Sequence, residues 1–240
     1  MNAGILQLGN SLLSYEKQLA VISNNIANAD TDRFKNDTLV VKTFADYYIE
    51  QINKDMGKAD LTKEVYTSFS QGIIEKSSDE NEIAIDGKGF MVVSVNNSDV
   101  YSRGGSISKN LDGFLADENG NLIVGENGPI KIAGDTFLIE TNGKVVSDEE
   151  TAGYIKLIDF SDYSGLQKMG NDYYANSSNQ QLIDSNAKVK QGYAEKSNAD
   201  MTNEYLRMME ISRLYETNQK TIQIIDEING KAANEMGRLY

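Results

Sequence analysis

Apolar residues recur at alternating intervals of three and four positions over the first part of the chain. This heptad spacing places them on one face of an α-helix, where they can form a seam against another helix. Leu6, Leu13 and Ala20 widen that face beyond the narrow stripe of a two-stranded coiled coil, which predicts a helix with more than one packing partner. An ordinary amphipathic helix on a local core fits the spacing equally well. The seam positions are Ile5, Leu8, Leu12, Tyr15, Leu19, Ile22 and Ile26.

The last part of the chain carries the same alternation. Ser197 followed by Asp200 is similar to a capping box, so we expect a helix that begins near 198–201 and runs almost to the last residue. Asn218 and Asn229 also occupy seam positions, where a buried Asn fixes the register at a cost in stability, although both can face water if the partner helix is short. The two terminal helices can therefore pair with each other. The remaining seam positions are Met208, Ile211, Tyr215, Ile222 and Ile225.

Between the terminal helices the apolar period changes to two, and Asp-Gly and Asn-Gly dipeptides recur. These dipeptides tolerate the positive φ of hairpin turns, so they predict a central all-β module of short hairpins. The whole chain is then an α+β fold, in which coiled-coil-like N- and C-terminal helices pack together. The expected strands are 82–85, 90–95, 113–116, 121–124, 130–132, 136–140, 144–147 and 154–160.

The charge distribution divides the chain in the same way. Of 23 basic and 36 acidic residues, 13 and 25 respectively lie in 36–189, and both ends are close to neutral. An acidic centre lacks the basic stripe that nucleic-acid binding needs, and it is typical of a well-solvated surface. We expect a terminal helical domain formed by 1–35 and 190–240, a central β domain at 72–189, and an extended or mobile connection at 36–71.

Missing residue types exclude several kinds of chemistry. The chain has no His, Cys or Trp, which rules out Ser/His/Asp and Cys/His catalysis and thiolate or imidazole zinc sites. Carboxylates near turns are the acid/base groups that remain, but no pattern pairs two of them, and 117–121 lacks the spacing of a calcium-binding EF-hand. We expect no enzyme, no metal and no cofactor. The sequence also lacks an apolar run of about 18 residues and a secretory signal peptide.

Three motifs in a fixed order resemble the flagellar basal-body rod proteins of bacteria. The stretch 19–31 with the following Phe-Lys resembles their N-terminal signature, 85–90 and 101–106 resemble their central β module, and 191–198 with the next helix resembles their C-terminal signature. The motif residues are Asn24, Asn25, Asn28, Thr31, Phe34, Lys35, Asp86, Gly87, Gly89, Phe90, Arg103, Gly104, Ser197 and Asn198.

One departure from the family pattern lies after the first helix. Asp32-Arg33 stand where the family usually has Pro-Gly, and Arg adopts the positive φ that Gly permits only at a steric cost. We expect Asn24, Asn25 and Asn28 to cap the first helix and fix the following turn. Plain surface polarity is the alternative for these three side chains.

The resemblance implies a structural subunit of the rod, and one β module in 240 residues is similar to the distal-rod members. A broad apolar helix face needs partners, and a heterologous contact between copies generates an open helical tube. By resemblance, the terminal helices would surround an export channel, and the tube would transmit torque.

The implied partners are copies of the chain, other rod and hook proteins, and the flagellar export apparatus, with no nucleic acid and no direct membrane insertion. The implied location is the basal body outside the cytoplasmic membrane, reached without a cleaved signal peptide. Two alternatives stay open at this point. One is a secreted coiled-coil fibre or adhesin with a β ligand-binding head, and the other is a carboxylate-based polysaccharide hydrolase.

Overall fold

The computed structural model describes residues 2–40, 64–134, 136–170 and 172–237. The chain divides into two compact units, and the polypeptide passes from one unit to the other several times. The helical unit comprises Met1–Ala29, Asp37–Ser68 and Ala199–Tyr240, and the β unit comprises Asp30–Asn36 and Phe69–Asn198. The expected α+β class is confirmed: one helix lies near each end of the described chain, and the part between them is rich in strands.

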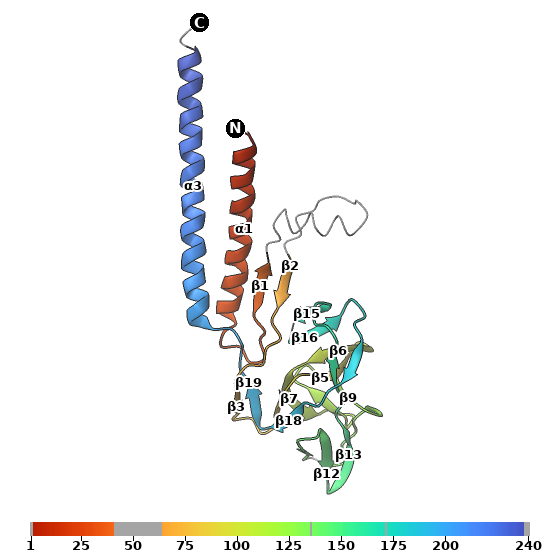
Figure 1. Cartoon of the computed structure of the whole chain (residues 1–240). Helices are drawn as coiled ribbons and strands as arrows, with labels where there is room; N and C mark the ends of the chain where they lie inside the picture. The colour runs from red at the N-terminus through yellow and green to blue at the C-terminus, as the bar shows by residue number, and fades with distance from the viewer. Residues whose placement is uncertain (1, 41–63, 135, 171, 238–240) are drawn as a thin grey trace. The chain divides into compact units, whose positions relative to one another are not determined.

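The helical unit is built on α1 (Asn2–Ala27) and α3 (Met201–Gly237), which pack against each other in opposite directions (Figure 1). The capping residue of α3 is Asp200, because its carboxylate Oδ1 accepts the backbone N–H groups of Thr202 at 2.9 Å and Asn203 at 3.2 Å. The helix therefore begins inside the expected window, with Asp200 in the capping role.

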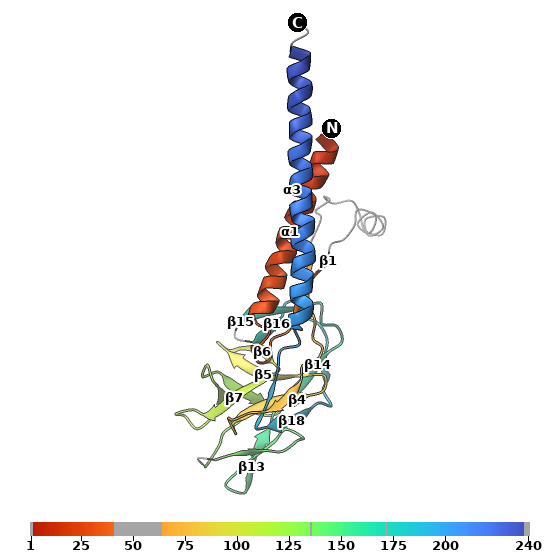
Figure 2. The same cartoon turned by 90° about the vertical axis from the view of Figure 1, so that its left-hand side faces the viewer.

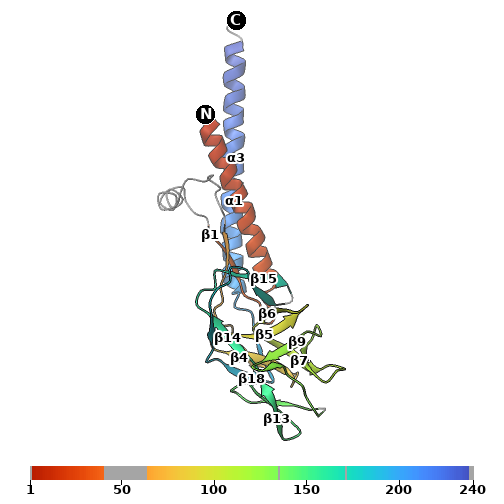
Figure 3. The same cartoon turned by 90° about the vertical axis from the view of Figure 1, so that its right-hand side faces the viewer.

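The two helices differ in length. α3 has 37 residues and α1 has 26, which at 1.5 Å per residue leaves about 16 Å of α3 without a counterpart. Figure 2 and Figure 3 show α3 continuing past the start of α1, as Figure 1 does. The C-terminal turns of α3 thus lack cover from α1.

Two strands complete the helical unit. β1 (Asp37–Val40) pairs in antiparallel register with β2 (Glu64–Thr67), and β1 packs against α1. Their β-branched and aromatic residues suit a pleated, half-covered surface. Both described ends of the 36–71 connection are therefore paired strands, whereas 41–63 lie outside the described residues.

The β unit is dominated by one antiparallel sheet. Among the described residues its strands follow the order β15-β16-β6-β5-β9-β8-β7-β4-β18, with β10 beside β9 and β14 beside β5 and β17. Its strands are β4 (Glu82–Asp86), β5 (Phe90–Val95), β6 (Ser98–Ser102), β7 (Gly104–Lys109), β8 (Leu115–Asp117), β9 (Leu122–Gly125), β10 (Gly128–Pro129), β14 (Leu157–Phe160), β15 (Leu166–Gly170), β16 (Tyr173–Asn176), β17 (Leu182–Asp184) and β18 (Lys188–Gln191).

Two smaller sheets belong to the same unit. One contains β11 (Leu138–Ile139), β12 (Lys144–Ser147) and β13 (Glu150–Tyr154), and the other pairs β3 (Ile74–Lys76) with β19 (Tyr193–Glu195). The β3–β19 pair joins the first and last strands of the unit. It therefore brings the two ends of the central sequence together.

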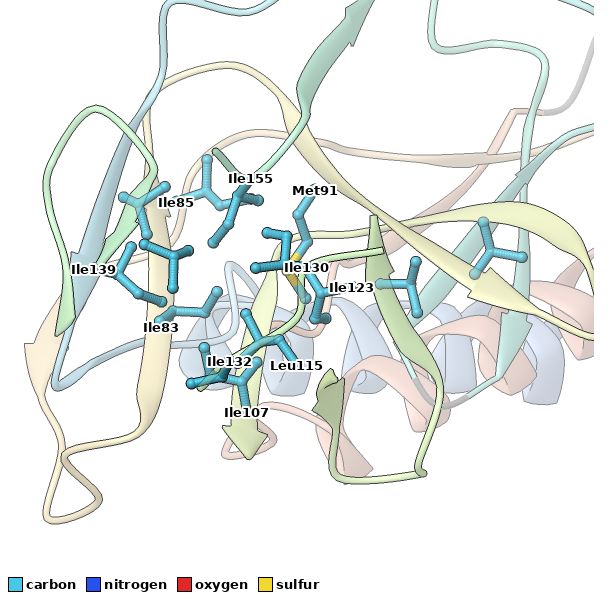
Figure 4. Close-up of a cluster of buried hydrophobic side chains, with 14 of the residues drawn as sticks. Ile83, Ile85, Met91, Ile107, Leu115, Ile123, Ile130, Ile132, Ile139 and Ile155 are labelled. Atoms are coloured by element: carbon cyan, nitrogen blue, oxygen red, sulfur yellow. The ribbon is translucent and has the colours of Figure 1, made fainter. Parts of the chain in front are cut away.

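The main core of the β unit is aliphatic. Figure 4 shows Ile83 and Ile85 of β4, Ile107 of β7, Leu115 of β8 and Ile123 of β9 gathered around one interior. A second buried cluster is aromatic, with Phe90 in edge-to-face contact with Phe160 and Tyr174. These two cores hold the sheet that carries the central motif residues, among them Asp86 of β4, Phe90 of β5 and Gly104 of β7.

Candidate functional site

A buried ion network lies in the β unit where the first and last motifs meet. Glu195 Oε1 accepts a hydrogen bond from Lys35 Nζ at 2.6 Å, and Glu195 Oε2 accepts one from Arg103 Nε at 3.0 Å. The side chains of Lys35 and Glu195 are 0% exposed and that of Arg103 is 3% exposed. The Gly72 backbone N–H also donates to Glu195 Oε1, at 2.9 Å. One carboxylate thus serves two buried cations and one backbone donor.

Arg103 extends the network into the central motif. Its guanidinium donates to the carbonyl oxygens of Ile85 at 3.0 Å, Gly87 at 2.9 Å and Gly89 at 2.5 Å, and it lies over the Phe90 ring. A planar guanidinium satisfies several carbonyls at once because its five donors point outward in a fixed plane. Arg103 therefore fixes the backbone of the 85–90 motif.

Gly104 follows Arg103 at a position that excludes side chains. Its φ is +138°, and a Cβ atom there would lie 2.2 Å from the carbonyl oxygen of Ile83 on the paired strand β4. Only glycine allows β7 to approach β4 this closely.

The segment around Lys35 is held by further hydrogen bonds. Lys35 Nζ donates to the Ser70 carbonyl oxygen at 2.9 Å, and Asn198 Nδ2 donates to the same carbonyl at 3.0 Å. The Asn198 side chain in turn accepts the backbone N–H of Asn36 at 2.7 Å. Burial lowers the pKa of Lys35 below its usual value of 10.5, and the Glu195 carboxylate opposes that shift. We call Lys35, Arg103, Glu195 and Asn198, with their hydrogen-bond partners, the motif junction.

Arg33 has the backbone conformation of the glycine that the family pattern would place there. Its φ is +65°, and its backbone N–H donates to the carbonyl oxygen of Glu195 at 2.6 Å. Its guanidinium, 11% exposed, forms ion pairs with Glu82 at 3.1 Å and with Glu118 and Asp172 at 3.4 Å. Burial raises the pKa of Asp172, and Arg33 opposes that shift. The ion pairs thus offset the steric cost of an arginine with positive φ.

The remaining motif residues of the β unit surround the junction. Lys168 Nζ lies 4.4 Å from the centre of the Phe34 ring, and the Phe34 backbone N–H donates to the carbonyl of Thr31. Lys190 pairs with Asp86 at 2.8 Å, and its ammonium lowers the pKa of that carboxyl. Ser197 is half-buried and precedes Asn198.

The motif asparagines of α1 lie in the helical unit. Asn25 is buried, and its side-chain amide both donates to the Asp37 carbonyl at 2.8 Å and accepts the Asp37 N–H at 2.9 Å. Asn28 donates to the carbonyl of Asn24 from its backbone at 3.1 Å and from its side chain at 2.9 Å. Asn28 therefore closes the last turn of α1, and Asn25 ties α1 to β1. The Asn24 side chain is exposed.

Most of the predicted seam residues are half-buried. Ile22 is buried, and every other seam residue whose side chain the structure describes is half-buried, including Asn218 and Asn229; the Ile5 side chain lies outside the described part. The half-buried residues are Leu8, Leu12, Tyr15, Leu19, Ile26, Met208, Ile211, Tyr215, Ile222 and Ile225.

A second apolar face of α3 points away from the seam. Leu206 and Ile224 are 18 residues apart, which is five helical turns, so they lie on one line along the helix, and Ile228 lies a turn further. These side chains are 55%, 56% and 58% exposed. Single exposed apolar side chains are common on protein surfaces, and exposed Arg213 and Thr217 lie between Leu206 and Ile224 on this face.

The Asp117 carboxylate of the acidic turn 117–121 is hydrogen-bonded to other groups of the β unit. Asp117 Oδ1 accepts the backbone N–H groups of Asn119 at 3.0 Å and Asn121 at 2.8 Å, and Asp117 Oδ2 accepts the hydroxyl of Tyr173. Burial and that hydrogen bond raise the pKa of Tyr173 to about 12. Among the described residues, no three acidic side chains gather where they could hold a metal ion.

Neither Glu195 nor Glu204 is among the site residues predicted from the sequence. Glu195 lies inside the quoted 191–198 motif, and a glutamate in the last strand before a helix is a weak signal for a buried ion pair. The importance of Arg33 was visible only as a departure from the family pattern. Its carboxylate partners could not be identified because they are 49 to 139 positions away.

Comparison with known proteins matches the segments that meet at the junction. Residues 15–35 match the family described as "Flagella basal body rod protein", and residues 190–235 match "Flagellar basal body rod FlgEFG protein C-terminal". The buried Lys35–Glu195 ion pair therefore joins one residue from each matched segment.

Whole-length relatives agree with these matches. The flagellar hook-basal body complex protein FlhO of Bacillus subtilis is 26% identical over 100% of both chains. The flagellar basal-body rod protein FlgF of Caulobacter vibrioides is 28% identical over 95% of both chains. The rod protein FlgG of Bacillus subtilis is 28% identical over 92% of this chain and 94% of its own length. The chain is thus similar to flagellar basal-body rod proteins over nearly its whole length.

The end of the first motif and the last motif therefore meet in the β unit although they lie about 160 residues apart. Neither described helix contains a stretch that is apolar and long enough to cross a lipid bilayer.

Proposed function

We propose that the chain is a structural subunit of the flagellar basal-body rod and that it self-assembles through its terminal helices. The exposed second face of α3 carries this proposal. The seam side of α3 packs on α1, whereas Leu206, Ile224 and Ile228 remain largely exposed and α3 extends about 16 Å further than α1. Neighbouring copies would bury both of these surfaces.

The contact between copies is expected to be heterologous. The second face of α3 differs in sequence from the seam and from the faces of α1, so one copy offers a surface that the next copy covers with a different one. Repetition of such a contact gives an open helical assembly instead of a closed dimer. We propose that this assembly is a hollow tube, with the terminal helices around the export channel. Its place in the distal rod, and export without a cleaved signal peptide, stay predictions from the resemblance.

The motif junction supports a role under mechanical load. It ties 32–36, 70–72 and 195–198 to one another, and these segments lie beside every point where the polypeptide leaves or enters the β unit. Force on any connection would then reach the sheet through several buried hydrogen bonds at once. We propose that this arrangement lets the subunit transmit torque.

Polymerisation of the purified chain tests the proposal. We expect concentration-dependent growth of open tubes, followed by light scattering and electron microscopy. The double variant I224S/I228S should remove growth without loss of helix content, since both residues are exposed in the single chain. The control Gln223→Ser alters an exposed polar residue of the same helix and should polymerise normally.

The same measurement separates the rod subunit from a secreted fibre or adhesin with a β ligand-binding head. That alternative predicts a closed oligomer, for instance a trimer, whose mass stays constant as concentration rises. A constant small mass, together with normal hooks and filaments in cells that lack the gene, would exclude the rod proposal.

A further inference from the structure

A pocket of about 290 Å³ lies in the helical unit between α1, β1 and the first turns of α3. Its apolar wall includes Ile22 of α1, Leu39 of β1 and Ile211 of α3. Its charged groups are Glu204, Glu210, Asp37 and Arg207, so acidic groups outnumber the basic one. A pocket with an acidic lining and apolar walls suits a ligand that has a cationic head and an aliphatic stem.

Glu204 is the unusual residue of this pocket. It is 4% exposed, and among the described residues its buried Oε2 has no hydrogen-bond partner. Its Oε1 lies 3.8 Å from Arg207 Nη1, which is a long ion pair. Buried carboxylate oxygens nearly always accept a hydrogen bond, because the lost hydration must be replaced. Because Glu204 lines the pocket, its unpartnered oxygen points to a donor beyond the described residues.

The other acids of the pocket have different surroundings. Asp37 Oδ1 accepts the hydroxyl of Thr67 at 2.7 Å, and Glu210 is exposed. Glu204 also lies in the first turn of α3, near the positive end of the helix dipole. The Glu204 carboxylate is thus less completely hydrogen-bonded than that of Asp37 and less exposed than that of Glu210.

We propose that this pocket binds a lysine side chain of a second copy of the chain, with Glu204 as the acceptor of its ammonium group. This inference rests on the proposed self-assembly and identifies one contact within it. We choose lysine over arginine as the bound side chain because 18 of the 23 basic residues are lysines. Of the five arginines, Arg33 and Arg103 belong to ion networks of the β unit and Arg207 lines the pocket itself.

The variant Glu204→Gln tests the proposal, because it keeps the size of the side chain and removes the charge. We expect the critical concentration for polymerisation to rise at least tenfold, while the thermal unfolding of the unassembled chain stays the same or moves upward. The control Glu216→Gln changes an exposed glutamate of α3 outside the pocket and should polymerise like the wild type.

A second measurement identifies the bound group. Carbodiimide joins a carboxylate to an amine in direct contact, so polymers mixed from ¹⁴N- and ¹⁵N-labelled chains should yield a Glu204–lysine crosslink between differently labelled copies. Unassembled chains should not yield it. Unchanged polymerisation of Glu204→Gln, or a Glu204 crosslink that forms only within one copy, would refute the proposal.

Failure of the proposed function itself is distinguishable. If the wild type does not polymerise, the pocket is tested directly with n-butylammonium, which reproduces the end of a lysine side chain. Saturable chemical-shift changes of the Glu204 carboxylate would support the pocket's ligand class, and their absence would refute it. A response to Mg²⁺ alone would contradict the assignment to an amine.

Discussion

Removal of the Glu195 carboxylate should be among the most damaging single changes in the β unit. Glu195→Ala takes away the acceptor of Lys35 Nζ, of Arg103 Nε and of the Gly72 N–H. It leaves two cations in an interior where Lys35 is 0% exposed and Arg103 is 3% exposed. Lys35 then keeps the Ser70 carbonyl, and Arg103 keeps the carbonyls of 85–89, but neither has a counter-ion within the network.

The expected loss in the free energy of unfolding is about 3–5 kcal/mol, as found when one partner of a buried ion pair is removed. Lys35→Met should cost less, because Glu195 and Arg103 still pair and the methionine replaces the aliphatic stem of the lysine. Which of the two variants loses more free energy of unfolding is a sharper test than either value alone. The expected order follows from the position of Glu195 between two cations.

Urea denaturation monitored by near-UV circular dichroism measures the free energy of unfolding of both variants. The 13 tyrosines supply the signal, because the chain has no tryptophan. The matched control is Glu75→Ala, an exposed glutamate on β3 opposite Ala194 of β19, which should change stability by less than about 0.5 kcal/mol. A Glu195→Ala variant within about 1 kcal/mol of the wild type, or a Lys35→Met variant that is less stable than Glu195→Ala, would refute the reasoning.

Three further changes test other parts of the β unit. Arg33→Gly should be more stable than Arg33→Ala by about 1 kcal/mol, because both lose the same ion pairs and only alanine keeps the strain of positive φ; equal denaturation midpoints would contradict this. Gly104→Ala should destabilise the unit by about 1–3 kcal/mol through collision with the Ile83 carbonyl, and an unchanged melting temperature would show that the strands can separate at little cost. Burial and hydrogen bonds to carboxylates raise the pKa of Tyr163 and Tyr173 to about 12 from 10.0, so the folded state keeps protons that the unfolded state loses. Their stabilising contribution is therefore complete below pH 10 and is lost as pH rises towards 12, whereas Lys35, with its lowered pKa, contributes the opposite slope up to its unfolded value of 10.5. Urea midpoints should fall above pH 10.5, and Tyr163→Phe should make that fall shallower; a flat profile, or one that the variant leaves unchanged, would show that the tyrosines do not cause it.

Periodicity located the helices well because their signal is local. The alternation of three and four positions depends only on neighbouring turns, and the residues it selects in α1 and α3 are those with partial burial. Strands 90–95 and 144–147 were predicted with the bounds that β5 and β12 have. By contrast, 136–140 contributes only Leu138–Ile139, and 154–160 is divided between β13 and β14.

Several strands carried no recognisable local signal. β15 reads LQKMG and β7 contains two glycines, so neither shows the apolar alternation of a half-buried strand. Their conformation comes from pairing with neighbours, because an antiparallel partner satisfies the backbone N–H and C=O groups whatever the side chains are. The expected domain boundaries differ from the two units for a related reason. Residues 30–35 and 190–198 were grouped with the terminal helices, whereas the compact β unit includes them, and Arg33, Lys35 and Glu195 form ion pairs there.

By itself, the sequence determined the two amphipathic helices, the strand-rich centre, the absence of histidine and cysteine chemistry, and the resemblance to rod proteins, since each of these is a property of composition or of short-range spacing. Only the tertiary structure decided that Lys35 and Glu195, 160 positions apart, share one buried ion pair, and that Glu204, whose Oε2 has no hydrogen-bond partner among the described residues, lines a pocket. The physical reason is that burial removes water from a charge, and which groups replace that water depends on segments that are distant in sequence and adjacent only in the fold.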